Sequence, residues 1–325
     1  MKISRILVAC LIASMGSAAF ASAKFNLKMG HAVNATDGQH AAAMKLAELV
    51  KQRTNGDVEI TVFPANQLGN DAAMINGVRG GTIDIVSSGA SNYNGIVPNT
   101  AAMELPFVFR SAQHAYNVLD GAVGTGVLNE LAPHGMKGLA YWENGWRAFT
   151  NNKRPVNKPE DLKGLKIRST PNPYHIQAFR LLGMNPSPMP IAELYTALET
   201  GTFDAQEHPI NVTWSSKFYE VQKHLTVSNH VYSPLIVSMN KAKFDSLPAN
   251  YQTIVVEAAR EAAKFQRNLN ASNAGKVVAD LKKSGMQVIE NVDMAPFQKI
   301  VSAEIAKTFG EKNGPALLQA IENTK

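Results

Sequence analysis

Short strand patterns and short helix patterns alternate along the first part of this chain, and that alternation constrains the fold more than any other feature of the sequence. Residues 58–62 alternate apolar and polar side chains, as a half-buried strand does, whereas apolar residues in 43–50 recur at helical spacing. The predicted elements are, in order, strand 25–30, helix 43–50, strand 58–62, helix 72–78 and strand 82–86. This order predicts an α/β fold with an open, largely parallel sheet.

The same alternation returns in the middle of the chain. Its predicted elements are strands 138–150 and 165–168 and helices 174–182 and 191–198. A length of 325 residues is enough for about two domains, each with its own core. A helical pattern then covers 248–283, which is longer than the diameter of one small domain. We therefore predict two α/β domains and a long helix that spans both.

The start of the chain has the pattern of a secretory signal rather than of a folded segment. Lys2 and Arg5 precede an apolar run, and Ala-Ser-Ala at 21–23 is a small-x-small cleavage site. The run is shorter than the roughly 20 residues that a retained membrane helix needs. A lipoprotein box at 7–10 is the alternative, but cleavage there leaves an apolar core of only a few residues. We predict a signal peptide at 1–23 and a periplasmic protein.

Composition excludes several classes of function. The only cysteine, Cys10, lies in the predicted leader, so the exported chain has no disulfide, no thiolate nucleophile and no cysteine metal site. The chain has 32 Lys and Arg against 26 Asp and Glu; removing Lys2 and Arg5 leaves 30 against 26, a formal charge of +4. This mild excess suits an anionic small ligand. The basic residues are too dispersed for a nucleic-acid surface, so no nucleic-acid partner is expected.

Standard catalytic signatures are mostly absent from the sequence. It contains no G-x-S-x-G elbow, no H-E-x-x-H and no Walker loop, and the glycines at 121–126 have the wrong spacing for a dinucleotide. The eight histidines form no i, i+4 pair with an acidic partner, which argues against a zinc site. Ser87-Ser88-Gly89 is more typical of a loop than of a nucleophile turn. We predict no catalytic residue, no metal and no cofactor.

Two arginines near the ends of predicted strands are the most informative polar residues. Arg147 follows the aromatic stretch 141–146, and Arg168 ends the strand 165–168. Open α/β sheets bind ligands outside the carboxyl ends of their strands. A guanidinium stays charged and offers parallel donors that match a carboxylate. The two arginines are candidates for a carboxylate clamp, and an ordinary surface or ion-paired role is the alternative for each.

Three further residues are candidates for ligand contacts. Trp146 offers an apolar wall for a ligand, although a core position is the alternative. His208 has a ring N–H for a ligand carboxylate or hydroxyl, and Glu207 is suited to accept hydroxyls or to orient an arginine. A satisfied structural role is the alternative for both polar side chains.

The sequence resembles the extracytoplasmic solute-binding proteins of tripartite ATP-independent periplasmic (TRAP) transporters over essentially the whole chain after the leader. Six motifs in family order carry the resemblance, at 63–69, 80–84, 105–109, 161–168, 193–200 and 217–223. It implies two α/β domains joined by crossing strands and a long helix, a Venus flytrap that closes by a hinge on a carboxylate ligand. It also implies delivery to a membrane permease driven by an ion gradient rather than by ATP.

The resemblance also implies domain boundaries and site residues. Domain I consists of 24–144 with about 233–272, and domain II of 145–232 with about 273–325. Arg168 matches the principal carboxylate-binding arginine of the family and Arg147 its second arginine. His208 falls where many members have asparagine, and Asn92 and Asp71 align with first-domain pocket positions. Pro171 and Ile191 replace an asparagine and a phenylalanine of sialic-acid-binding members, which argues against that ligand.

Within the family, four stretches are most similar to the members that bind 2,3-diketo-L-gulonate: 74–84, 141–147, 204–211 and 233–235. We therefore expect a monomeric receptor, not an enzyme, for this sugar acid or a related hexonate or hexuronate. A C4-dicarboxylate or 2-oxo acid receptor is the alternative within the family. Outside it, the alternatives are a periplasmic sugar-acid isomerase or lyase that uses His208 and Glu207 as acid and base, and a ligand-presenting partner of a membrane kinase.

Overall fold

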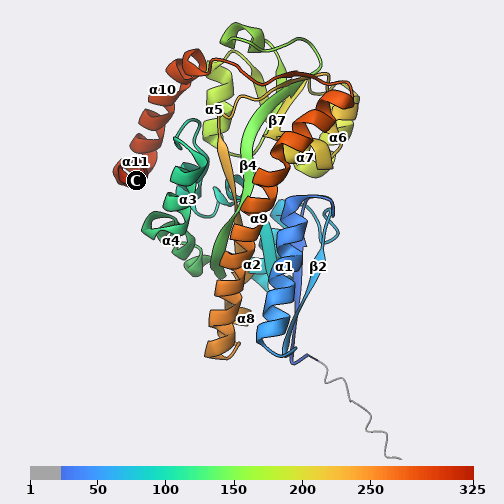
Figure 1. Cartoon of the computed structure of the whole chain (residues 1–325). Coiled ribbons are helices and arrows are strands. Elements are labelled where there is room, and N and C mark those ends of the chain that lie inside the picture. Colours follow the sequence, from blue (N-terminus) through green and yellow to red (C-terminus); the bar gives the residue numbers. More distant parts are fainter. Residues whose placement is uncertain (1–22) are drawn as a thin grey trace, which may run out of the picture.

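The computed structural model describes residues 23–325 of the chain and is drawn in Figure 1. The predicted leader, apart from Ala23, and the alternative lipoprotein box lie outside the described residues. Ten strands form one continuous sheet in which β4 (Met136–Asn151) belongs to both halves. Its residues 136–146 pair with β9 (Tyr232–Asn240), whereas 147–151 pair with β7 (Ala205–Pro209). The change of partner on β4 divides the molecule into a first and a second half.

The first half is built on the order β2-β1-β3-β9-β4. Its parallel strands are β1 (Phe25–His31), β2 (Val58–Phe63) and β3 (Ile85–Gly89). Its helices are α1 (Gly38–Arg53), α2 (Asp71–Gly80), α3 (Ala112–Asp120), α4 (Ala122–Asn129) and α8 (Lys241–Asp245). The third strand starts later than predicted because the N–H groups of Thr82 and Ile83 still donate to Gly77 O at the end of α2.

The second half extends the sheet from β4 through β7 and β5 (Lys166–Ser169) to β6 (Asn185–Pro188). Two short strands, β8 (His224–Thr226) and β10 (Gln287–Ile289), pair beside β4. The helices of this half are α5 (Pro173–Leu181), α6 (Ile191–Glu199), α7 (Ile210–Ser215) and α10 (Ala295–Asn313), whereas the last helix, α11 (Ala316–Asn323), contacts α4 of the first half. The strand and the helices predicted between 165 and 198 are confirmed.

The sheet is mixed, so the prediction of a largely parallel sheet is wrong in its centre. β9 runs antiparallel to both β3 and β4, and β4 runs antiparallel to β7 and β8. The chain crosses from the first half to the second along β4 and returns along β9. Two neighbouring strands that carry the chain in opposite directions are necessarily antiparallel.

One helix, α9 (Ala249–Lys283), runs along both halves, as predicted. Its 35 residues correspond to about 50 Å. It contacts α1 and β4 in the first half and α7 and β10 in the second, and Figure 1 shows it crossing the molecule in orange. Trp142 Nε1 on β4 donates to Ala259 O at 2.9 Å and fixes the helix against the sheet. None of the helices between residues 23 and 325 is apolar enough over a sufficient length to cross a membrane.

We propose that the two halves are two domains with the boundaries expected from the sequence. The boundary at 144/145 lies within three residues of the point where β4 changes partner. The crossing strands and α9 then form the hinge between the domains.

Candidate functional site

The basic residues predicted for the site lie on adjacent strands of the second half. Arg147 starts the part of β4 that pairs with β7, Arg168 lies on β5 and His208 on β7. Their exposed fractions are only 1%, 4% and 4%. Together with Asp71 and Asn92 of the first half, they line a cavity of about 60 Å³, here called the site cavity. Its remaining lining includes Gln39, Ser88, Asn144, Thr170, Ile191 and Val212.

Arg168 is a buried cation without an anionic partner among the described residues. Its Nε donates to Met189 O at 2.8 Å, and its Nη1 lies 3.4 Å from His208 Nε2. Burial, and after it the charge of Arg147, lowers the pKa of Arg168 to about 10. The group still carries its proton at neutral pH. A desolvated guanidinium of this kind is suited to bind an anion that enters the cavity.

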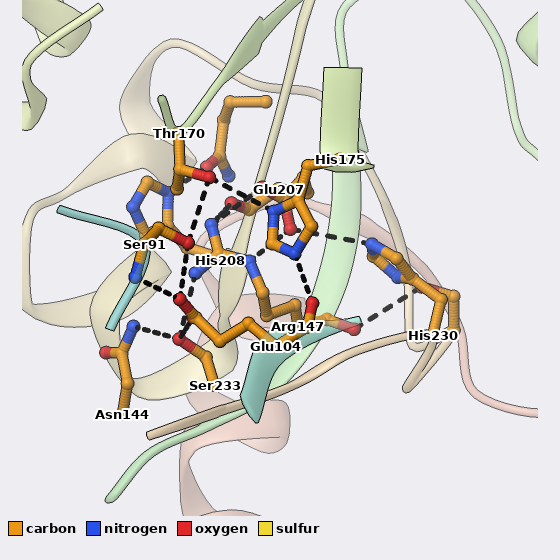
Figure 2. Close-up of polar contacts among 12 residues, drawn as sticks. Ser91, Glu104, Asn144, Arg147, Thr170, His175, Glu207, His208, His230 and Ser233 are labelled. Carbon is orange, nitrogen blue, oxygen red and sulfur yellow. Dashed lines mark hydrogen bonds and ion pairs between the residues drawn. The ribbon is translucent and has the colours of Figure 1, made fainter. Parts of the chain in front are cut away.

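Arg147, in contrast, is neutralised by Glu207, as Figure 2 shows. Arg147 Nη2 lies 2.7 Å from Glu207 Oε1, its Nε contacts the other carboxylate oxygen, and its Nη1 lies 3.4 Å from Ser233 Oγ. Burial opposes ionisation of Glu207, but the positive charge of Arg147, the nearby ring of His230 and the hydrogen bonds from Arg147 hold its pKa well below the usual range. Of the two roles considered for Glu207, the geometry favours orienting an arginine, because Glu207 does not line the site cavity.

His208 faces Arg168 with an acceptor rather than with the donor expected from the sequence. Gln206 Nε2 donates to Thr150 Oγ1 at 2.7 Å, which leaves Gln206 Oε1 to accept from His208 Nδ1. We assign the tautomer from this network, so His208 Nε2 carries the lone pair. Burial, followed by the charges of Arg147 and Arg168, holds the pKa of His208 well below its usual value. A neutral His208 therefore adds no second charge beside Arg168.

The first half contributes a chain of hydrogen-bonding side chains to the cavity. Ser88 Oγ donates to Asp71 Oδ1 at 2.6 Å, and Asn92 Nδ2 donates to Ser88 Oγ at 2.9 Å. Gln39 also lines the cavity, and its Nε2 donates to Ser87 O at 2.9 Å. Burial raises the pKa of Asp71, and the hydrogen bond from Ser88 and the charge of Arg168 partly oppose that rise. Ser87 and Ser88 thus hold neighbouring polar groups in place.

A second network joins the two halves beside Arg147 (Figure 2). Thr170 Oγ1 lies 3.1 Å from His175 Nδ1 and donates to Ser91 Oγ at 3.3 Å. His175 Nε2 donates to the backbone oxygen of Glu104, whose carboxylate accepts from Ser91 and Ser233. Thr170 and His175 belong to the second half, so these contacts close one edge of the site cavity.

Trp146 is the one predicted site residue that faces a different cavity. It lines a cavity of about 940 Å³, here called the outer cavity, between α7, α9 and the loop 35–38. Its ring packs edge-on against Tyr232 with the ring centres 5.3 Å apart. Asn144 lines both cavities. Within residues 23–325, no group of three His, Cys, Asp or Glu side chains is arranged to hold a metal ion.

Sequence reasoning missed several residues that line the site cavity, among them Gln39, Asn144 and Thr170. Thr170 directly follows the strand of Arg168, so its place at a strand end was a usable signal. Gln39 lies in the first turn of α1, and nothing in its local pattern marks it.

The chain matches the family DctP, described as bacterial extracellular solute-binding protein, family 7, over residues 29–312. Among characterised relatives, it is 45% identical to the 2,3-diketo-L-gulonate-binding periplasmic protein YiaO of Escherichia coli K12, over 100% of both chains.

Solved structures of TRAP periplasmic solute-binding proteins share the fold. The protein from Polaromonas sp. JS666 bound to D-erythronate has a TM-score of 0.90 and 36% identity, covering 93% of this chain and 99% of its own. The sugar-acid-binding protein of Advenella mimigardefordensis with galactonate has a TM-score of 0.88 and 31% identity, covering 94% and 100%. The protein of Sulfurospirillum deleyianum with succinate has a TM-score of 0.88 and 30% identity, covering 93% and 100%.

Proposed function

Because the chain belongs to bacterial extracellular solute-binding protein family 7 and is a TRAP solute receptor, we propose that it binds a sugar acid and delivers it to the membrane permease. The proposed ligand is 2,3-diketo-L-gulonate or a related hexonate or hexuronate. The relative from E. coli, named for binding 2,3-diketo-L-gulonate, supports this choice, as does the structure solved with galactonate.

The observation that carries the proposal is the buried charge of Arg168. A carboxylate that enters the site cavity meets one free guanidinium, because Arg147 is already paired with Glu207. A charge-assisted hydrogen bond there contributes about 1.5–3 kcal/mol. The rest of the ligand then faces Asp71, Ser88 and Asn92, which suit hydroxyl and keto groups.

The size of the cavity implies that the protein opens to admit its ligand. A volume of about 60 Å³ is far below the several hundred Å³ of typical ligand pockets. Entry of a six-carbon acid therefore requires the two halves to open, and its binding in the closed state requires the side chains that line the cavity to move apart. Movement about β4, β9 and α9 is consistent with the predicted Venus flytrap closure.

The main alternative ligand is a C4-dicarboxylate or a 2-oxo acid. It is supported by the structural neighbour that was solved with succinate. A second carboxylate opposite Arg168 approaches Asp71, which already has one carboxylate oxygen bonded to Ser88. Two acceptors without a donor repel each other, so a diacid is disfavoured.

The isomerase or lyase alternative has weak support from the geometry. Both carboxylate oxygens of Glu207 are engaged by Arg147, and burial with the charges of Arg147 and Arg168 keeps His208 neutral. Glu207 does not line the site cavity and the lowered pKa makes His208 a weak base, so we propose a receptor without catalytic activity. A periplasmic, monomeric protein is part of the same proposal, and a ligand-presenting partner of a membrane kinase is the remaining alternative.

A thermal-shift screen of ligand-free protein tests the proposal. The panel holds 2,3-diketo-L-gulonate, D-gluconate, the matched diacid D-glucarate, the matched neutral sugar D-glucose, and succinate. A ligand at about 100 times its Kd adds about 2.7 kcal/mol of stability. We expect stabilisation by at least one monocarboxylate sugar acid and none by D-glucose. Stabilisation by succinate alone would replace the sugar-acid proposal with the dicarboxylate one.

A further inference from the structure

The loop that precedes α1 contacts the end of α7, across the two halves of the molecule. Asn34 Nδ2 donates to Ser215 O at 2.8 Å, and Ser215 Oγ donates to Asp37 Oδ2 at 2.8 Å. Asn211 Nδ2 lies 3.5 Å from the same carboxylate oxygen. Asp37 and Ser215 are both buried. We call Asn34, Asp37 and Ser215 the clasp.

Asp37 links the clasp to the scaffold of the first half. Its Oδ1 accepts from Gln39 N at 2.9 Å and so caps the N-terminus of α1, while its Oδ2 is left for Ser215. The cap fixes the carboxylate in position whether or not the second half is close. A hydrogen bond from Ser215 to this preset, buried acceptor therefore forms without further ordering of the first half.

The clasp lies between the two cavities. Asp37 and Ser215 line the outer cavity, whereas their close sequence neighbours Gln39 and Val212 line the site cavity. On the other edge, the contacts of Thr170 with Ser91 and of His175 with Glu104 join the same two halves (Figure 2). The site cavity thus has cross-half hydrogen bonds on two sides, and no clasp residue lines it: Asp37 and Ser215 line the outer cavity and Asn34 lines neither.

We propose that the clasp holds the two halves closed over a bound ligand and sets the rate at which the ligand dissociates. Opening of the cavity separates Ser215 from Asp37, so the clasp stabilises the closed state and not the open one. Encounter with ligand takes place in the open state, so the clasp affects the association rate only through the fraction of ligand-free protein that is open; where about half of that protein is open, the effect is at most about twofold. The statement about the ligand rests on the proposed function; the statement about closure does not.

Ser215→Ala tests the clasp without removing a group that lines the site cavity or the cap of α1. With 2,3-diketo-L-gulonate as the probe in stopped-flow measurements, we expect the dissociation rate to rise by about tenfold and the association rate to stay within about twofold. Ser111→Ala is the matched control, because it removes the side-chain cap of α3, a hydrogen bond of Ser111 Oγ within the first half. It should lower stability without changing either rate.

A second measurement needs no ligand. Spin labels on cysteines introduced at the exposed positions Met44 and Thr202, in a chain that starts at Lys24 and so has no cysteine of its own, report the distance between the halves. In ligand-free protein, Ser215→Ala should shift the distance distribution towards longer separations, and Ser111→Ala should not. If the probe does not bind wild-type protein, the choice of 2,3-diketo-L-gulonate as ligand fails and the label distances still decide the clasp. Unchanged distances, or an unchanged dissociation rate where the probe binds, would overturn the clasp.

Discussion

At the scale of single residues, the two buried arginines have different environments and therefore different roles. The charge of Arg147 is neutralised by Glu207 in an ion pair. The hydrogen-bond partners of Arg168, in contrast, are the neutral groups Met189 O and His208. The sequence suggested both arginines, together with His208, Asp71 and Asn92, because strand ends and family motifs mark these positions. It could not reveal the contact between Gln39 and Ser87, which lie 48 residues apart, because that contact depends on how α1 packs on the sheet.

Breaking the buried ion pair should destabilise the protein strongly. Glu207→Gln leaves the Arg147 charge buried without a counter-charge, and we expect the free energy of unfolding to fall by about 3–5 kcal/mol. The double variant Arg147→Met, Glu207→Gln should recover much of this loss, since it removes the unpaired charge. Urea denaturation measures both values. A Glu207→Gln protein as stable as wild type would show that the pair is not the neutralising contact described here.

Buried histidines should make the protein less stable in acid. Burial, together with the neighbouring His40, lowers the pKa of His31 to about 4, against about 6.5 when unfolded. Between these values the unfolded chain binds a proton that the folded chain does not, so stability falls as the pH is lowered from 7 towards 4. His31→Gln should reduce this slope by up to about 1.4 kcal/mol per pH unit.

Urea denaturation at pH 7, 6 and 5 measures the two slopes. The exposed His134→Gln is the control and should keep the wild-type slope. Equal slopes for wild type and His31→Gln would exclude His31 as a source of the pH dependence.

At the scale of elements, periodicity located the strands and helices but not the direction of pairing. Every residue of β9 is buried, so the strand shows no alternation that a sequence pattern can detect. Its Pro234 lies opposite Glu143, at an irregularity in the register with β4. A buried strand that contains proline is a weak sequence signal, and the antiparallel centre of the sheet was missed for this reason.

The irregularity of β4 makes Gly145 a sensitive position. Its φ is +124°, a conformation that side-chain-bearing residues rarely adopt, and an added Cβ would lie 3.3 Å from Pro209 Cβ. We expect Gly145→Ala to lower the free energy of unfolding by about 1–3 kcal/mol. Gly126→Ala on α4 is the control, because its added Cβ meets no atom within 4 Å and should be neutral or stabilising. Chemical denaturation measures the free energy of unfolding of both variants. An equal change for Gly145→Ala and Gly126→Ala would contradict the backbone strain assigned to position 145.

At the scale of the whole molecule, the two halves meet around one small polar cavity and are connected by β4, β9 and α9. The sequence predicted the long helix and two α/β units, because both follow from local patterns. It did not predict which groups cross between the halves. Contacts such as Asp37 with Ser215, which are 178 residues apart, arise only when the folded halves approach each other.

The central claim is that the free charge of Arg168 anchors the carboxylate of a sugar acid. Isothermal titration of wild-type protein and of Arg168→Met with 2,3-diketo-L-gulonate tests it most directly. The account predicts a measurable Kd for wild type and an affinity about tenfold to a hundredfold weaker for the variant, which loses the charge while keeping the fold. An equal Kd for the two proteins would contradict the account.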